Sequence, residues 1–239
     1  LFREENLIND LYIFSKKNFI IFIFIQSAIF MVGLYDDKYQ VNASSRLILF
    51  TIFISILCLA DKTLLIDRLF FSFTSYELSI LTLSIPFSIF CFLVFIVSIN
   101  MFDGINLQVS IFYLFSLIFI ILKTQNLIFL TFVIPLILVI ILNFRNKLFL
   151  GDSGSYLVAF LISFFFLKLY IDDSTIFSDH IFLALLIPVL DASRVIIERI
   201  IKGYPVFNGD QKHIQHILLK KYKYKKSILI ITCLYFLPY

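Results

Sequence analysis

Residues 79–106, SILTLSIPFSIFCFLVFIVSINMFDGIN, decide the fold of this chain, because an apolar run long enough to cross a lipid bilayer ends in a carboxylate. A spanning helix needs about 20 mostly apolar residues, and 79–99 supply them. Membrane helices tolerate a proline such as Pro86. Asp103 follows the run, and a carboxylate at the end of a span is a candidate functional residue. The stretch therefore predicts a spanning helix with a polar site at one end.

The same pattern recurs along the whole chain. Hydrophobic residues make up 61% of the 239 residues and charged residues 15%, whereas a soluble domain has roughly a quarter charged residues. Further apolar runs are found at 18–35, 46–60, 107–122, 127–143, 155–171, 179–199 and from 227 onward. We predict an all-α fold, a polytopic transmembrane helical bundle of about eight spans. Residues 1–239 are expected to form a single integral-membrane domain.

The two ends of the sequence look cut. The chain opens on LFREEN, without an initiator Met or a signal-peptide pattern, and it ends within an apolar run. We therefore expect a fragment that lacks at least one N-terminal span.

The distribution of charge predicts an orientation in the membrane. If the spans alternate in direction, the loops 35–45, 100–106, 143–154 and 200–226 share one side and are rich in Lys and Arg. The positive-inside rule makes that side cytoplasmic. We expect a multi-pass protein of the cell inner (plasma) membrane, with its acid-bearing loops at the cytoplasmic face.

Two of these acid-bearing loops are GLYDD (33–37) and NMFDGIN (100–106). The adjacent Asp36 and Asp37 suit a magnesium ion or the acceptance of a proton, although a solvated turn that caps the next helix is an alternative. Gly104 allows close approach to a ligand, and the amide of Asn106 suits the edge of a base. An ordinary turn between helices would explain the second loop as well.

The segment FLGDSGS (149–155) places Asp152 among two glycines and two serines. We predict a flexible loop that can offer a metal ligand and backbone N–H groups to a pyrophosphate. The pattern GxxxxGK[ST] of a P-loop is absent. Phe149 can stack on a base, although packing is the commoner role of a phenylalanine.

Two later segments carry charge and imidazole. In PVLDASRVIIER, Asp191, Arg194 and Glu198 share one helical face, where mutual pairing and catalysis both remain open. GDQKHIQH (209–216) contains Asp210, Lys212 and two histidines, which suit the binding of phosphate better than zinc because further zinc ligands are lacking.

The run KKYKYKK (220–226) is basic, with interleaved tyrosines. We interpret it as a contact for anionic lipid headgroups beside a span and not for nucleic acid.

Taken together, from Gly33 to His216, these motifs resemble the polyprenyl-phosphate N-acetylhexosamine-1-phosphate transferases, the MraY/WecA-like family. GDQKHIQH is similar to the PDxxHIHH loop of the WecA-like branch, with Gln215 in place of the middle histidine. The resemblance implies transfer of an N-acetylhexosamine-1-phosphate from a UDP-sugar to polyprenyl (undecaprenyl) phosphate, with release of UMP. It implies Mg²⁺ as the cofactor, with Mn²⁺ as an alternative, and a role in starting a surface polysaccharide or cell-envelope glycan.

The resemblance also assigns roles to individual residues. The expected site comprises catalytic Asp36, Asp37, Asp103, His213 and His216, substrate-binding Asn100, Gly104, Asn106, Phe149, Arg194 and Lys212, and the metal ligand Asp152. The expected partners are the lipid acceptor, a UDP-N-acetylhexosamine and the membrane, and the sequence leaves a homodimer open. The alternatives are a multi-span transporter, and an inactive paralogue of the transferase.

Overall fold

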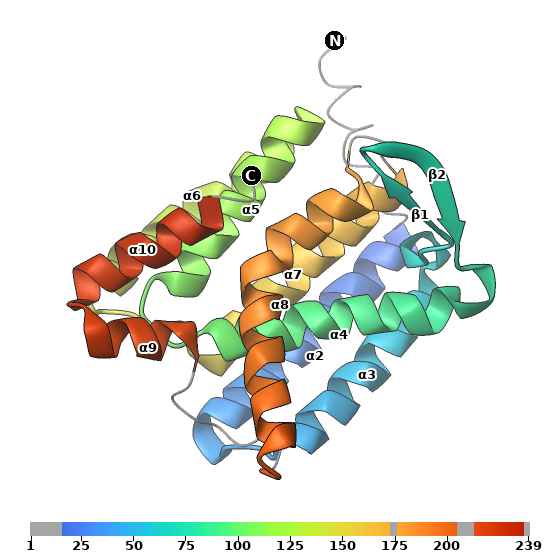
Figure 1. Ribbon diagram of the computed structural model, residues 1–239. Coiled ribbons are helices and arrows are strands. Elements are labelled where there is room, and N and C mark those ends of the chain that lie inside the picture. The colour runs from blue at the N-terminus through green and yellow to red at the C-terminus, as the bar shows by residue number, and fades with distance from the viewer. Residues whose placement is uncertain (1–15, 173–175, 205–212, 237–239) are drawn as a thin grey trace.

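The computed structural model describes residues 16–172, 176–204 and 213–236, which form a bundle of α-helices with a small β-hairpin at one end (Figure 1). The helices are α2 (Lys16–Tyr39), α3 (Ala43–Ala60), α4 (Ser84–Phe102), α5 (Gln108–Thr124), α6 (Leu130–Phe144), α7 (Gly151–Asp172), α8 (Ser178–Ile201), α9 (Ile214–Lys221) and α10 (Tyr224–Phe236). The hairpin consists of β1 (Arg68–Phe71) and β2 (Thr74–Ser79). Short 3-10 turns are η1 (Lys62–Leu64), η2 (Leu81–Leu83) and η3 (Leu127–Phe129).

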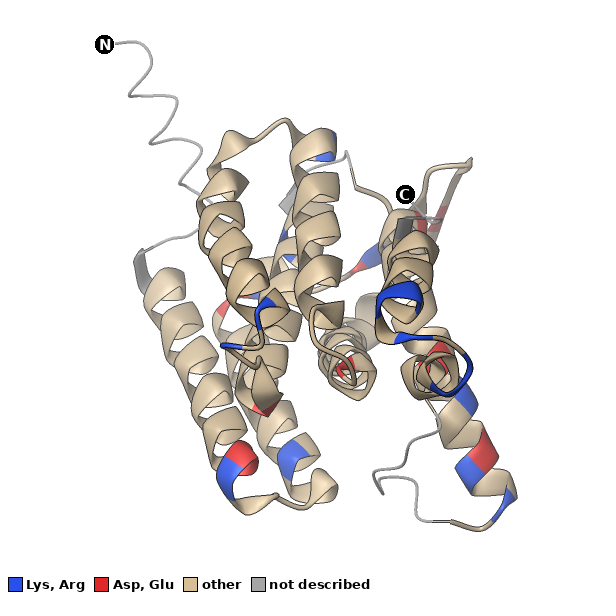
Figure 2. Ribbon diagram, turned by 90° about the vertical axis from the view of Figure 1, so that its left-hand side faces the viewer, with Lys and Arg blue, Asp and Glu red and all other residues tan. Residues whose placement is uncertain are grey.

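Most of these helices have the length and composition of membrane spans. Within the described ranges, six helical segments are long and apolar enough to cross a bilayer, namely α2, α3, α4 with η2, α6 with η3, α7 and α8. The apolar α5 is shorter, at 17 residues, and α10 has 13. Charged residues lie mainly toward helix ends (Figure 2). The predicted all-α polytopic bundle is confirmed, and each predicted span coincides with a helix whose ends differ by a few residues.

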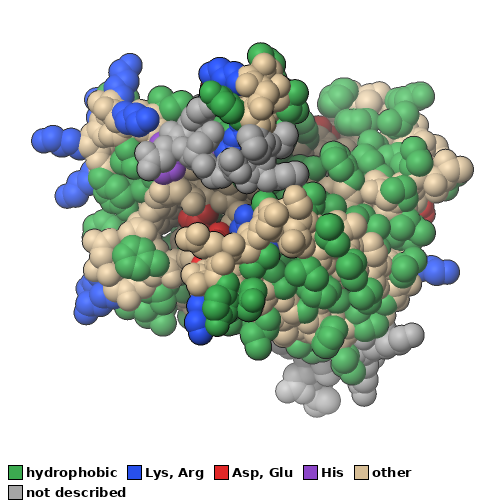
Figure 3. Space-filling view, turned by 90° about the horizontal axis from the view of Figure 1, so that it is seen from below, with side chains coloured by type: hydrophobic (Ala, Val, Ile, Leu, Met, Phe, Trp, Pro, Cys, Tyr) green, Lys and Arg blue, Asp and Glu red, His purple; other side chains and the backbone are tan. Residues whose placement is uncertain are grey.

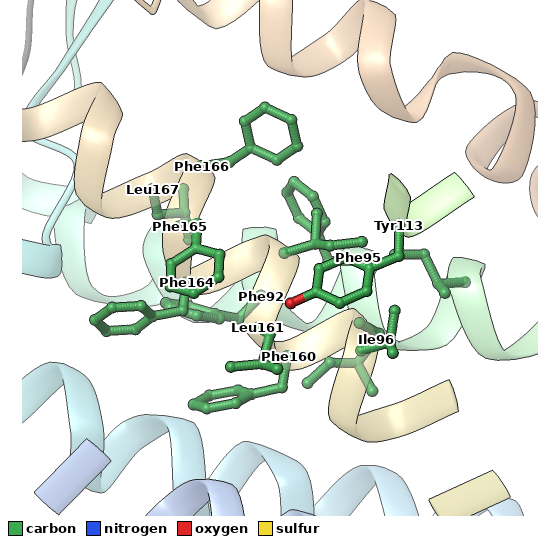
Figure 4. Close-up of a cluster of buried hydrophobic side chains, with 14 of the residues drawn as sticks. Phe92, Phe95, Ile96, Tyr113, Phe160, Leu161, Phe164, Phe165, Phe166 and Leu167 are labelled. Carbon is green, nitrogen blue, oxygen red and sulfur yellow. The ribbon is translucent and has the colours of Figure 1, made fainter. Parts of the chain in front are cut away.

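Helix α7 is the centre of the bundle. It packs against α2, α4 and α5, and nearly all of its residues from 155 to 170 are buried. Its aromatic side chains make the core, in which Phe160 stacks on Phe92 of α4 at 6.1 Å between ring centroids and Phe166 lies 6.0 Å from Phe95 (Figure 4). The outer helices expose many Ile, Leu and Phe side chains, as expected of surfaces that face lipid.

The segment between α3 and α4, which the predicted spans 46–60 and 79–99 leave as a connection, is not a simple loop. It forms the antiparallel hairpin, in which Arg68 pairs with Ser79 and Phe70 with Glu77. The hydroxyl of Tyr170, near the end of α7, accepts a hydrogen bond from the Phe70 backbone N–H at 2.9 Å and donates one to the Arg68 carbonyl at 2.7 Å. Contacts with a helix that is distant in sequence therefore hold a strand pair whose own pattern is short and irregular.

Candidate active site

The predicted acidic and histidine residues gather at the end of the bundle opposite to the hairpin. Seen from below, this end is hollowed, with acidic side chains inside the hollow and basic side chains nearby (Figure 3). The C-terminal end of α2, the loop after α4, the start of α7 and the start of α9 supply the residues of this region. Segments up to 180 residues apart in sequence, such as those of Asp36 and His216, are thereby brought to one place.

Asp37 joins the end of α2 to the start of α7. Its two carboxylate oxygens accept hydrogen bonds from the backbone N–H groups of Asp152, at 2.7 Å, and Ser153, at 3.2 Å. The first N–H groups of a helix lack partners within the helix, and a carboxylate there also meets the positive end of the helix dipole. The predicted flexible loop FLGDSGS is therefore wrong from Gly151 onward, because Asp37 caps these residues as the first turn of α7.

The approach of these two helices requires glycine. A Cβ atom on Gly33 would lie 2.4 Å from the Ser153 Cα, and one on Gly151 would lie 2.9 Å from the Asp37 carboxylate oxygens. Gly151 also has a φ of +65°, a conformation that side-chain-bearing residues rarely adopt. Both glycines thus set the distance between α2 and the acidic start of α7.

Asp36 faces a different set of partners. Its carboxylate is buried and accepts hydrogen bonds from the Val41 backbone N–H at 2.8 Å, from the Tyr156 hydroxyl at 3.2 Å and from the Arg46 guanidinium. Arg46 also donates to the Tyr156 hydroxyl at 2.7 Å. Asp36 therefore orients Arg46 and Tyr156, which both line a cavity of the site. Asp36 itself lines neither of the two polar cavities described below.

Asp152 and Asp103 lie near each other with few compensating charges. The Asn100 amide donates to an Asp152 carboxylate oxygen at 2.9 Å and to the Ser155 hydroxyl at 3.0 Å. Burial, together with the negative charges of Asp152 and Asp37, raises the pKa of Asp103 to about 7. Carboxylates that disfavour one another's ionisation create a place where a cation is stabilised.

Two cavities meet at Asp103 and Gly104. The first, here called the carboxylate cavity, has a volume of about 320 Å³, and its lining includes Asp37, Asp103, Asn106, Asn143, Phe149 and Asp152. The second, here called the imidazole cavity, has a volume of about 270 Å³, and its lining includes Arg46, Asn100, Asp103, Tyr156, Arg199, His213, Gln215 and His216. The loop after α4 thus separates an acidic compartment from one that contains arginines and imidazoles.

The loop that separates the cavities is fixed by amide side chains. The buried Asn143 accepts from the Leu107 backbone N–H at 2.6 Å and donates to the Leu148 carbonyl at 3.0 Å. Asn106 donates to the Asn146 side chain at 3.0 Å. Phe149 has two thirds of its surface exposed, at 66%, so its ring is available at the wall of the carboxylate cavity.

The histidine segment packs onto the other face of the same loop. The buried Gln215 donates to the Met101 carbonyl at 3.4 Å, and a Cβ atom on Gly104 would lie 2.5 Å from the Gln215 side chain. Glutamine at this position therefore packs against the backbone of the loop. His213 precedes α9 and His216 lies in its first turn, and both line the imidazole cavity.

Of the predicted substrate-binding residues, one lies away from the cavities and another falls outside the part of the chain that the structure describes. Arg194 lines neither cavity and instead binds Asp191 at 2.9 Å, with Glu198 at 4.0 Å, so the pairing alternative for this helical face is observed. Lys212, like Asp210, lies outside the described residues.

An apolar groove adjoins the imidazole cavity. It has a volume of about 870 Å³ and runs between α4 and α8 to the hairpin. Leu47, Val97 and Ile196 line both the groove and the imidazole cavity. At its far end, the Asp179 carboxylate accepts hydrogen bonds from the Ser72 backbone N–H at 2.8 Å and hydroxyl at 2.5 Å. The groove thus leads from the hairpin end of the bundle to the polar site.

Arg46, Tyr156 and Asn143 were not among the residues predicted for the site. Arg46 could have been recognised as a candidate site residue, because it is a charged residue at the start of an apolar run. Tyr156 could have been recognised because it lies one helical turn after Asp152. Asn143 is harder to recognise from the sequence, since its only distinguishing feature is an amide side chain near the end of a span. Among the described residues, no three His, Cys, Asp or Glu side chains form a ready-made metal cage.

Comparison with known proteins places this geometry in context. The pattern of the family described as glycosyl transferase family 4 matches residues 19–170. The chain is also similar to a probable undecaprenyl-phosphate N-acetylglucosaminyl 1-phosphate transferase of Bacillus subtilis (strain 168), with 26% identity over 220 residues. The matched region covers 87% of this chain and 61% of that protein.

Proposed function

Because this chain belongs to glycosyl transferase family 4, we propose that it transfers an N-acetylhexosamine-1-phosphate from a UDP-sugar to a polyprenyl phosphate in the membrane and releases UMP. The Bacillus subtilis relative is described as a probable transferase of this kind. Family membership alone does not specify a reaction, so the proposal depends on the site.

The observation that carries the proposal is the continuity of the apolar groove with the two polar cavities. An acceptor with a long hydrocarbon tail and an anionic head needs an apolar channel that ends at cations. The groove reaches the imidazole cavity at Leu47, Val97 and Ile196. There Arg46, His213 and His216 can bind phosphate oxygens, since charge-assisted hydrogen bonds to phosphate are among the strongest in proteins.

The carboxylate cavity suits the nucleotide part of the donor. Phe149 offers an exposed ring face on which a base can stack, and the amides of Asn106 and Asn143 lie on the same wall. A UDP-sugar seated there would direct its pyrophosphate toward Asp103 and Gly104, where the two cavities meet. The phosphate of the acceptor would then approach from the opposite side.

In the proposed reaction, an oxygen of the polyprenyl phosphate attacks the β-phosphorus, which carries the sugar. A new P–O bond forms there, and the bond from the β-phosphorus to the bridging oxygen breaks, so UMP leaves with that oxygen. Placement of two reactants on opposite sides of one phosphorus is the geometry of an in-line displacement. The residues of the chain position both phosphates and exclude water, and most of the rate would come from that positioning.

The acidic residues fit a divalent cation. Mg²⁺ is usually held by one or two carboxylates together with waters and substrate phosphates, so the absence of a three-residue cage among the described residues does not argue against it. Asp152 and Asp103 would hold it, and the negative charges of Asp152 and Asp37, which add to the effect of burial in raising the pKa of Asp103, are charges that a cation would neutralise. Bound Mg²⁺, or Mn²⁺ in its place, would neutralise charge on the pyrophosphate.

The contacts of Asp36 and Asp37 give both residues structural roles that do not require proton transfer. Asp37 orients Asp152 by capping α7, and Asp36 orients Arg46 and Tyr156. A phosphate monoester is largely ionised at neutral pH and can attack without a base. We therefore propose that the acid pair acts by positioning and that Asp36 is not the base.

The test is UMP release by purified protein supplied with undecaprenyl phosphate, Mg²⁺ and a panel of UDP-sugars. Asp152→Asn should abolish turnover while thermal stability is kept, and Asp67→Asn, an exposed carboxylate at the hairpin end, serves as the matched control. Failure of every UDP-sugar to yield UMP would refute the transferase proposal. Flux of a solute through vesicles without any chemistry would favour the transporter, and stable folding without either activity would favour the inactive paralogue.

The remaining expectations concern the orientation of the protein in the membrane, the use of its product and its oligomeric state. We propose that the site faces the cytoplasm at the inner membrane, where nucleotide sugars are made, and that the product starts a surface or envelope glycan. Labelling of single cysteines placed at residues 149 and 216, in a variant without the three native cysteines, from each side of the membrane tests the orientation. Sedimentation of the detergent-solubilised protein tests the homodimer.

A further inference from the structure

The buried carboxylate of Asp191, which lies behind the imidazole cavity, has no role in the reaction as described so far. Asp191 lies in α8 three residues after Pro188, and it is 6% exposed. Its Oδ2 lies 2.8 Å from Nδ1 of His213, which is also 6% exposed. A buried charge is costly unless it is fully hydrogen-bonded, so this carboxylate is held by specific partners.

The partners of Asp191 define the tautomer of His213. Its Oδ1 accepts hydrogen bonds from the Arg194 guanidinium at 2.9 Å and from the Ile214 backbone N–H at 3.0 Å. A carboxylate in such surroundings is ionised and can only accept hydrogen bonds. Nδ1 of His213 must therefore be the donor, and Nε2 is the ring nitrogen available to a ligand.

Nε2 belongs to a residue that lines the imidazole cavity, whereas Asp191 does not line it. We propose that Asp191 is a positioning residue, which fixes the ring and tautomer of His213 so that Nε2 meets a phosphate group in the imidazole cavity. With its proton on Nδ1, the ring can accept a hydrogen bond at Nε2 from a protonated phosphate oxygen, whereas a doubly protonated ring would donate one from Nε2 to a phosphate oxygen. The identity of that phosphate as a substrate group rests on the proposed function.

The tautomer itself can be measured without any substrate. The chain has three histidines, so ¹⁵N-histidine NMR of the protein in micelles, at a pH where the ring is neutral, is tractable and His213→Gln assigns the signal. In the unmodified protein, we expect a proton on Nδ1. In Asp191→Asn, the amide oxygen should stay with Arg194 and the Ile214 N–H, so the NH₂ group faces the ring and the proton moves to Nε2. An Nδ1–H tautomer retained in Asp191→Asn would overturn the proposal.

Kinetic measurements can distinguish a role of Asp191 in positioning His213 from a purely structural role in connecting α8 to α9. At metal sites, loss of a carboxylate that orients a liganding histidine costs roughly 10- to 100-fold in activity, and we expect Asp191→Asn to lose a factor of that order in UMP release. If Asp191 acts through His213, the double variant with His213→Gln should be no worse than His213→Gln alone. Losses that multiply in the double variant would show a structural role and refute positioning.

Two further variants complete the experiment. Glu198→Gln removes the same charge from the same helix away from both cavities, and we expect its activity to be unchanged. Asp191→Glu keeps the charge and should retain the Nδ1–H tautomer and more activity than Asp191→Asn. If no UDP-sugar is turned over, the proposed function fails while the tautomer measurement still decides the role of Asp191.

Discussion

The partly buried carboxyl of Asp103 makes the stability of the protein depend on pH in a direction that can be predicted. Its pKa is about 7 in the folded protein, against an ordinary value of 3.8. Between these values the folded state keeps a proton that the unfolded chain has lost. The free energy of unfolding therefore decreases as the pH rises from about 4 to 7 and is level above that.

The replacement Asp103→Asn removes this titration. A difference of about 3 pKa units corresponds to at most about 4 kcal/mol, at about 1.36 kcal/mol per unit. Roughly 3 kcal/mol of this falls between pH 5 and pH 8, and for a chain of this size it corresponds to roughly 6–12 °C in melting temperature. The variant should thus gain stability relative to the unmodified protein as the pH rises, while UMP release is lost.

The assay is thermal unfolding in detergent by intrinsic tyrosine fluorescence, at intervals from pH 5 to pH 8.5, with EDTA present so that no divalent cation offsets the charge. The exposed Asp67, changed to Asn, is the control and should not alter the pH profile. A difference in melting temperature between Asp103→Asn and the unmodified protein that stays constant across this range would refute the reasoning.

Three other changes test separate contacts. Asp37→Ala removes the cap of α7 and should lower the free energy of unfolding by about 1–2 kcal/mol, as measured by thermal unfolding; an unchanged melting temperature would contradict the cap. Gly33→Ala forces α2 away from Ser153 and should cost about 1–3 kcal/mol, with lower UMP release; full activity would contradict the close packing. Phe149→Ala should weaken UMP binding by about 1–3 kcal/mol in calorimetry, as loss of stacking does, without change in stability; unaltered affinity would exclude stacking.

The helices could be predicted from sequence because each depends on its own composition. Every apolar run long enough to span a bilayer became a helix, since backbone groups in lipid must bond within the segment. The hairpin at 68–79 was missed because its strands are held by Tyr170, about 100 residues away in the chain. Gly151 to Ser155 were predicted as a loop because their local preference is for turns, and Asp37, 115 residues from Asp152, overrides that preference.

The gathering of the acids and imidazoles at one end followed from the alternation of spans, but their individual tasks did not. Sequence alone put Asp36 and Asp37 in one role, whereas the folded chain gives them separate partners in α3 and α7. Asp191 remained open between pairing and catalysis, because its contact with His213 depends on how α9 packs on α8. Such tasks depend on tertiary contacts that no local pattern encodes.

Helix α7 begins at Gly151, carries Asp152 in its first turn at the acidic hollow, and reaches Tyr170, which holds the hairpin. With 22 residues it is roughly 33 Å long, and it is clamped by aromatic side chains along its length. One continuous helix therefore carries both an acidic residue of the carboxylate cavity and the tyrosine that binds the hairpin, so a substitution that tilted its hairpin end would also displace Asp152.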